Sequence, residues 1–161
     1  MAQQSFLQPG GPAPRRMFGG GAFVAKFLEA QNAVYPQVLH ELRAGHKRTH
    51  WMWFIFPQIA GLGRTAVSRH FAIEDIGEAE AYLAHPILGG RLRECTSAVL
   101  LHAPGGAAPR GLTQIFGTPD DLKFHSSMTL FHRANPDEPL FDRALRAFFR
   151  NREDPATLEL L

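Results

Sequence analysis

One stretch decides the fold of this chain, and it reads Arg48-Thr49-His50-Trp51-Met52-Trp53-Phe54-Ile55-Phe56-Pro57-Gln58-Ile59-Ala60-Gly61-Leu62-Gly63-Arg64. It holds both tryptophans of the protein, and two phenylalanines follow them within three positions. Each large ring buries about 150–250 Å² of surface, so a block this dense predicts the centre of the hydrophobic core. Polar residues border the block, with His50 before it and Gln58 and Arg64 after it.

The aromatic block itself is apolar on every side, as a buried strand or a buried helix would be. No second convincing strand exists for it to pair with, and an isolated strand is not stable. We therefore expect a short buried helix or an irregular segment that ends before Pro57. The sequence Gly61-Leu62-Gly63 then predicts a flexible loop.

The rest of the chain carries helical patterns. Apolar residues recur at spacings of three and four, Gly45 is a plausible helix C-cap, and Asp75 with Glu78 forms a capping signal. Glu41 falls outside the apolar stripe of its helix, so we expect it to face water. The pattern predicts a mostly α fold, a single compact domain of about eight short helices with no substantial sheet.

The length of 161 residues is that of one domain. Residues 1–22 are rich in Gly and Pro and predict a disordered leader, which leaves residues 23–161 as a single helical domain. No apolar run is long enough to span a membrane. The single Cys95 excludes an intrachain disulfide and fits a reducing compartment, so we expect a cytoplasmic protein.

The charge does not favour nucleic acid as a partner. Arg15 and Arg16 account for the net charge of +2, because the residues from Phe23 onward carry 15 Lys and Arg and 15 Asp and Glu. A folded part without net charge lacks the positive field that non-specific nucleic-acid binding requires. A basic run comprising Arg43, His46, Lys47 and Arg48 is typical of a solvated helix end, although a local basic patch stays open.

Metal and cofactor signals are weak. His46 and His50 are four residues apart, but no third ligand stands at a suitable spacing, so we expect no metal. Asp120 and Asp121 share one helical turn, which favours a helix start over a nuclease-like metal site. No phosphate-binding glycine motif occurs between a strand and a helix, and we expect no cofactor.

A ligand pocket beside the tryptophans is the strongest functional hypothesis. Indole N–H groups and polar side chains near a core need partners, so these residues either pair with one another or line a pocket. Lys123, Ser126 and Ser127 form a second donor-rich turn that would hold an anion, while a tryptophan would stack on a planar ring. The candidate site residues are His50, Trp51, Trp53, Gln58, Arg64, Ser68, Lys123, Ser126 and Ser127.

Several long motifs follow one another along the chain, and they are His50–Gln58, Gly61–Arg64, Tyr82–Pro86, Leu88-Gly89, Arg91–Cys95, Ile115–Lys123 and Ser126–Phe131. Together they resemble a bacterial family known as domain of unknown function 1810. The resemblance covers Phe23 to the C-terminus, and it implies an all-helical single domain without implying an activity. Some members carry a calpastatin label, but this sequence lacks repeated inhibitory segments.

These observations lead to one favoured function and two alternatives. The favoured function is binding of a small anionic or planar, nucleotide-like metabolite in a pocket beside Trp51 and Trp53. One alternative is a non-enzymatic protein-interaction module. The other is an enzyme acting on a nucleotide or ADP-ribose-like substrate, in which His50 or His70 would act as acid or base. The sequence leaves open whether the protein is an enzyme.

Overall fold

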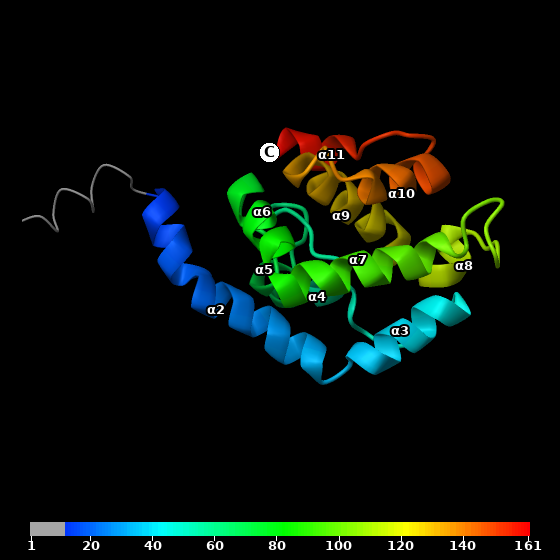
Figure 1. Ribbon diagram of the computed structural model, residues 1–161, viewed down its shortest axis with the longest axis horizontal. Coiled ribbons are helices and arrows are strands. Elements are labelled where there is room, and N and C mark those ends of the chain that lie inside the picture. The colour runs from blue at the N-terminus through cyan, green and yellow to red at the C-terminus, as the bar shows by residue number, and fades with distance from the viewer. Residues whose placement is uncertain (1–11) are drawn as a thin grey trace, which may run out of the picture.

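The protein folds as a bundle of short helices, seen here in a computed structural model that describes residues 12–161 (Figure 1). Within this part there are ten helices and no strand, apart from an isolated bridge between Ile59 and Ile73. The predicted mostly α, single-domain fold is confirmed, with ten helices in place of about eight. They are α2 (Pro12–Asn32), α3 (Tyr35–Ala44), α4 (Met52–Ile55), α5 (Ala66–His70), α6 (Ile76–Ala84), α7 (Pro86–Leu100), α8 (Leu112–Phe116), α9 (Asp120–Ala134), α10 (Pro139–Phe149) and α11 (Pro155–Glu159).

The first described helix begins earlier than the sequence predicted. α2 starts at Pro12, so the structure has helix over residues 12–22, where we predicted a disordered leader. Proline is tolerated in the first turn of a helix because its missing N–H would have no partner there. The predicted disorder of residues 1–11 lies outside the described residues, and the domain boundary at residues 22–23 stays a prediction.

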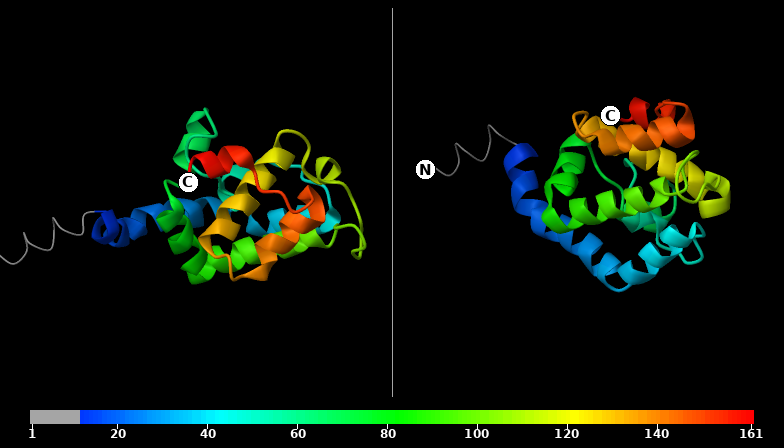
Figure 2. Two further views of the ribbon diagram at one scale, coloured as in Figure 1. Left: turned by 90° about the horizontal axis from the view of Figure 1, so that it is seen from above. Right: turned by 45° about the vertical axis from the view of Figure 1, so that its right-hand side comes forward.

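Figure 1 shows α9, α10 and α11 on one side of α7, and α2 and α3 on the other side. α9 contacts α6, α8, α10 and α11, whereas α7 contacts α3, α6 and α10. Figures 1 and 2 show α2 along one edge of the molecule, where its C-terminal end turns into α3. No helix among the described residues is both long and apolar enough to cross a membrane.

The aromatic block lies at the centre of the core, as the sequence predicted. α4 is a single turn, and Trp51, Met52, Ile55 and Phe56 are each at most 2% exposed. The ring of Phe56 meets Phe124 of α9 edge to face, with centroids 5.0 Å apart. The block is therefore a short buried helix, and its rings join α4 to α9.

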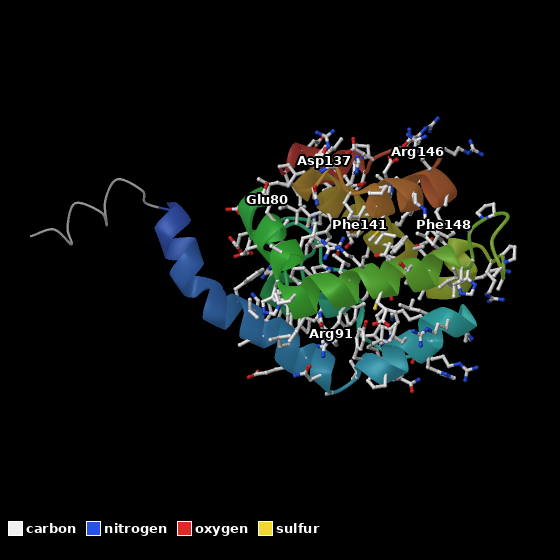
Figure 3. The ribbon with its side chains drawn as sticks, in the orientation of Figure 1. Glu80, Arg91, Asp137, Phe141, Arg146 and Phe148 are labelled. Carbon is white, nitrogen blue, oxygen red and sulfur yellow. The ribbon has the colours of Figure 1, made fainter. Side chains whose placement is uncertain are left out.

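A buried amide ties α2 to the rest of the bundle. Gln31 is 1% exposed, and its Nε2 donates to the Phe54 carbonyl at 2.7 Å and to the Tyr82 hydroxyl at 3.0 Å. Its Oε1 accepts from Nη1 of Arg91 at 3.2 Å, and Figure 3 labels Arg91 on α7 where α7 faces α2. Because both ends of the amide are satisfied, Gln31 joins α2 to α4, α6 and α7 without an unpaired buried group.

The helices α6 and α7 pack closely at their junction. Two adjacent glycines of α7, Gly89 and Gly90, allow this packing to be tested by substitution. A Cβ built on Gly89 would lie 2.1 Å from the Leu83 carbonyl oxygen, whereas a Cβ on Gly90 meets nothing within 4 Å. We expect Gly89→Ala to lower the free energy of unfolding by about 1–3 kcal/mol or more through overpacking. Urea denaturation followed by circular dichroism measures this change.

The matched control is Gly90→Ala in the same helix. Gly90 is exposed, so alanine only reduces the entropy of the unfolded chain and should stabilise the protein by about 0.5–1 kcal/mol. Equal effects of the two substitutions would show that the contact between Gly89 and Leu83 does not limit the packing of α6 on α7.

Candidate functional site

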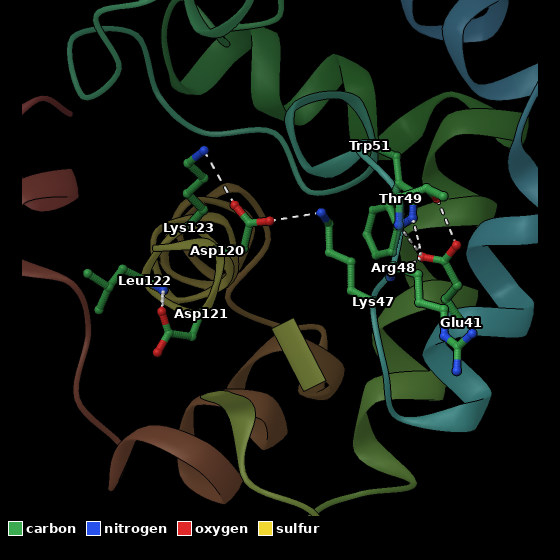
Figure 4. Close-up of polar contacts among 9 residues, drawn as sticks. All are labelled: Glu41, Lys47, Arg48, Thr49, Trp51, Asp120, Asp121, Leu122 and Lys123. Carbon is green, nitrogen blue, oxygen red and sulfur yellow. Dashed lines mark hydrogen bonds and ion pairs between the residues drawn. The ribbon is translucent and has the colours of Figure 1, made fainter. Parts of the chain in front are cut away.

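The aromatic block is held in place by the carboxylate of Glu41 (Figure 4). Glu41 is 1% exposed and accepts five hydrogen bonds. Its Oε1 accepts from the backbone N–H groups of Arg48 and Thr49 and from the Trp51 indole, the last at 2.9 Å. Its Oε2 accepts from the Thr49 hydroxyl and from Nε2 of Gln37. The expectation that Glu41 faces water is therefore wrong.

The error has a physical cause. The helical pattern places Glu41 outside the apolar stripe of α3, but the chain returns after Gly45 and covers it with residues 48–51. One local signal pointed to this role. Glu41 lies in the last turn of α3, where the helix dipole disfavours a carboxylate unless other donors compensate.

Trp51 is part of the buried core and does not line a ligand pocket. It is 1% exposed, its indole N–H is bound to Glu41, and Nζ of Lys47 lies 5.0 Å from the centroid of its ring. The cation–π contact and the hydrogen bond fix the side chain from two directions. A side chain buried this completely offers no open face on which a ligand could stack.

A chain of charges connects Trp51 to Trp53. Nζ of Lys47 lies 2.9 Å from Oδ2 of Asp120, and Nζ of Lys123 lies 3.4 Å from Oδ1 of the same carboxylate. Figure 4 shows Asp120 between the two ammonium groups. Nζ of Lys123 also lies 5.3 Å from the centroid of Trp53. Lys123 is thus paired with Asp120 and packed on Trp53.

A cavity lies beside Trp53, and we call it the Trp53 cavity. It has a volume of about 150 Å³. A bridge joins the loop after α4 to the segment before α6, because the Ile73 N–H donates to the Gln58 carbonyl and the Ala60 N–H donates to the Ile73 carbonyl, both at 2.8 Å. Side chains from α4, this loop, α5 and the segment after α5 line it, and those used below are Trp53, Gln58, Ser68, Arg69 and Glu74.

The structure brings together some of the predicted site residues and separates others. Trp53, Gln58 and Ser68 line the Trp53 cavity, and Lys123 contacts Trp53 without lining it. Arg64 is exposed on the loop that lines the cavity, next to the lining residue Gly63, and it has no ion pair within the described residues.

Three other predicted residues lie elsewhere. His50 is exposed and lines none of the recesses described here. Ser126 donates to Oδ2 of Asp154 at 2.8 Å, which ties α9 to the start of α11. Ser127 is completely buried, and its Oγ has no hydrogen-bond partner among the described residues. Ser126 and Ser127 therefore do not join Lys123 in one donor patch.

Sequence reasoning missed two charged residues of the cavity, Arg69 and Glu74. Arg69 lies in the last turn of the short helix α5, and Glu74 follows that helix. The start of α5 is fixed by Thr65, since the Thr65 hydroxyl accepts from the Ser68 N–H at 3.1 Å. The sequence held a signal for Arg69, because Thr65 is a common N-cap residue and a helix that begins there includes Arg69 beside Ser68, just after the glycine loop.

Comparisons with known proteins give a family and a fold. The profile of the family described as "Protein of unknown function (DUF1810)" matches residues 22–161. The crystal structure of the conserved hypothetical protein Rv1873 from Mycobacterium tuberculosis is similar, with 47% sequence identity and a TM-score of 0.79. The similarity covers 85% of this chain and 94% of that chain. No curated protein matches the chain.

Removing the charge of Glu41 should destabilise the fold. In Glu41→Gln, one oxygen becomes an NH₂ group, so donors on that side of the amide lose their acceptor whichever way it is turned. We expect the free energy of unfolding at pH 7 to fall by about 3 kcal/mol, measured by chemical denaturation. Glu29 is exposed on α2 and makes no side-chain hydrogen bond or ion pair in the described part, so Glu29→Gln should change the free energy of unfolding by less than about 0.5 kcal/mol.

The same carboxylate predicts a specific acid dependence. The hydrogen bonds to Glu41 lower its pKa from 4.5 to about 2, which outweighs the opposing effect of its burial. The stabilisation of about 3 kcal/mol is therefore complete above pH 4.5 and is lost as the pH falls toward 2. Denaturation curves between pH 7 and pH 2 should show this loss in the natural protein and a much smaller one in Glu41→Gln. Parallel pH profiles for the two proteins would contradict the assignment.

Proposed function

The chain belongs to the DUF1810 family of proteins of unknown function, and on that premise we propose that it binds a small ligand in the Trp53 cavity. The ligand carries one planar ring and an anionic group. The observation that supports this most is the convergence of Trp53, Gln58 and Ser68, from three segments, on one cavity.

The size of the cavity limits what enters it. A cavity of about 150 Å³ accepts a single ring, since an engineered cavity of about this volume binds benzene. A whole nucleotide is larger, so only its base or a comparable ring would lie inside. The anionic part of such a ligand would remain at the opening.

The lining residues suit a polar ring. Trp53 presents an indole, which stacks on planar groups. The side-chain amide of Gln58 makes no hydrogen bond within the described residues, so its donor and its acceptor are both available. A ring with adjacent donor and acceptor atoms, such as a nucleobase or a pyridine carboxylate, would use both.

Two arginines support an anionic group at the opening. Arg69 lines the cavity, Arg64 lies on the adjoining loop, and neither has an ion pair within the described residues. Glu74 is the one carboxylate among the lining residues and leaves a surplus of positive charge. Guanidinium groups bind carboxylates and phosphates with two parallel hydrogen bonds. Lys123 is paired with Asp120 and does not line the cavity, so Arg64 and Arg69 would bind the anion.

No observation in the described part of the chain favours the two alternatives over this ligand site. The exposed large apolar side chains of the described residues are spread over α5, both ends of α7, α9 and the C-terminal end of α11, and they are Val67, Ile87, Leu101, Leu122, Leu160 and Leu161. The acid–base candidates His50 and His70 are exposed and do not line the Trp53 cavity. Neither the interaction module nor the enzyme is therefore proposed.

The test is a binding screen with ring-containing anions. Nicotinate, orotate and the common nucleoside monophosphates, each at millimolar concentration, are added to the full chain while thermal unfolding and tryptophan fluorescence are followed. We expect at least one compound to raise the melting temperature and quench the fluorescence, since a ligand at ten times its Kd adds about 1.4 kcal/mol. In Trp53→Phe the quenching should disappear, because the remaining Trp51 is buried.

The charge requirement is tested with a matched pair of variants. Arg69→Ala should weaken binding of the compound found about tenfold, as expected for loss of one charge-assisted hydrogen bond. Arg143→Ala changes an exposed arginine of α10 that makes no side-chain hydrogen bond or ion pair in the described part, and it should leave binding unchanged. The proposal fails if no compound binds, or if both variants bind as the natural protein does.

A further inference from the structure

A second recess lies over the C-terminal half of α3, and we call it the α3 recess. Its volume is about 340 Å³, and it shares no lining residue with the Trp53 cavity. Nearly all of its lining side chains are polar or charged: Gln37, His40, Glu41, His46, Arg48 and Arg110. The proposed ring-binding function does not use any of them.

In the basic run of residues 43–48, some side chains form ion pairs and others line the α3 recess. Arg43 pairs with Glu94 at 3.5 Å, and Lys47 pairs with Asp120 at 2.9 Å. His46 and Arg48 line the α3 recess instead, and Arg48 has no ion pair within the described residues. Lys47 is turned into the protein while its two neighbours in the sequence line the recess, so the run has a buried side and an open side.

Arg110 brings a second unpaired guanidinium from far along the chain. Its Nε donates to the Gly45 carbonyl at 2.8 Å, and its side chain lies across the turn that ends α3. Gly45 has a φ of 74°, and a Cβ there would lie 2.6 Å from Cδ of Arg110. A glycine at this turn therefore permits both the left-handed backbone and the close approach of Arg110. Arg110 has no acidic partner in the described part of the chain.

The base of the recess is already rigid. The backbone N–H of Arg48 donates to Oε1 of Glu41 at 2.8 Å, and the backbone N–H of His46 donates to the Glu41 carbonyl at 3.0 Å. These bonds fix the backbone at His46 and Arg48. Less conformational entropy of the protein is therefore lost when a ligand binds to their side chains. The carboxylate of Glu41 is the single acid of the lining, and its oxygens are occupied by five donors.

From these observations we propose that the α3 recess binds the phosphate group of a small phosphorylated metabolite. Arg48 and Arg110 supply guanidinium donors to the phosphate oxygens, and His40 and His46 line the same recess with imidazole donors. Two guanidinium groups face one carboxylate, so an anion relieves their mutual repulsion. The site is independent of the ring-binding cavity, and either proposal can fail without the other.

The test measures pyrophosphate and inorganic phosphate binding to the full chain by isothermal titration calorimetry, with ionic strength held constant by sodium chloride. We expect saturable binding to the natural protein. Arg48→Ala should weaken it at least about tenfold, because a charge-assisted donor is lost while the backbone N–H that holds Glu41 remains. Arg143→Ala of α10 is the matched control and should bind with unchanged affinity.

A second variant covers the case in which Arg48→Ala folds poorly. His40 is exposed on α3 and makes no side-chain hydrogen bond or ion pair in the described part, so His40→Glu should fold normally while adding a negative charge to the recess. We expect it to abolish phosphate binding. The proposal is overturned if neither anion binds, if His40→Glu binds with unchanged affinity, if Arg143→Ala loses as much affinity as Arg48→Ala, or if only a single-stranded oligonucleotide binds.

Discussion

The hydrogen bond between the Trp51 indole and the carboxylate of Glu41 is the interaction on which the arrangement of this protein depends. A buried charge is costly unless it is fully hydrogen-bonded, and here the five donors come largely from a segment that has to turn back over α3 to reach it. The return of that segment places α4, and with it Phe56, against the rings of α9. One carboxylate thereby determines where the aromatic centre of the core lies.

The segment that turns back over α3 also contributes side chains to the protein surface. Lys47 points inward and joins Trp51 to the start of α9 through Asp120, whereas His46 and Arg48 extend into the α3 recess. Alternation along this short segment therefore separates a structural side from a side available to ligands. This separation explains how charged residues so close to the core can remain accessible.

Local signals predicted the helices well, because periodicity and capping depend on residues close in sequence. Asp75 caps α6 as expected, accepting from the Glu78 N–H at 2.9 Å, and Gly45 ends α3 with a left-handed φ. For the same reason the sequence located Trp53, Gln58 and Ser68, which are near one another along the chain. It failed where a long-range contact decides the outcome. The bond from Ser126 to Asp154 and the position of Arg110 beside Gly45 both require the folded chain.

The contact between Gly89 and Leu83 also has a mechanical consequence. Packed helices usually accommodate motion by sliding past each other through small side-chain adjustments. At the corner of α6 and α7 the backbones touch without an intervening side chain, so no such adjustment is available. Tyr82 of α6 holds Gln31 of α2, and Arg93 of α7 forms a bidentate pair with Glu138 before α10. The α6–α7 junction is therefore a rigid unit that is hydrogen-bonded to α2 on one side and to the start of α10 on the other. Any sliding of α2 relative to α10 has to be accommodated by the loops.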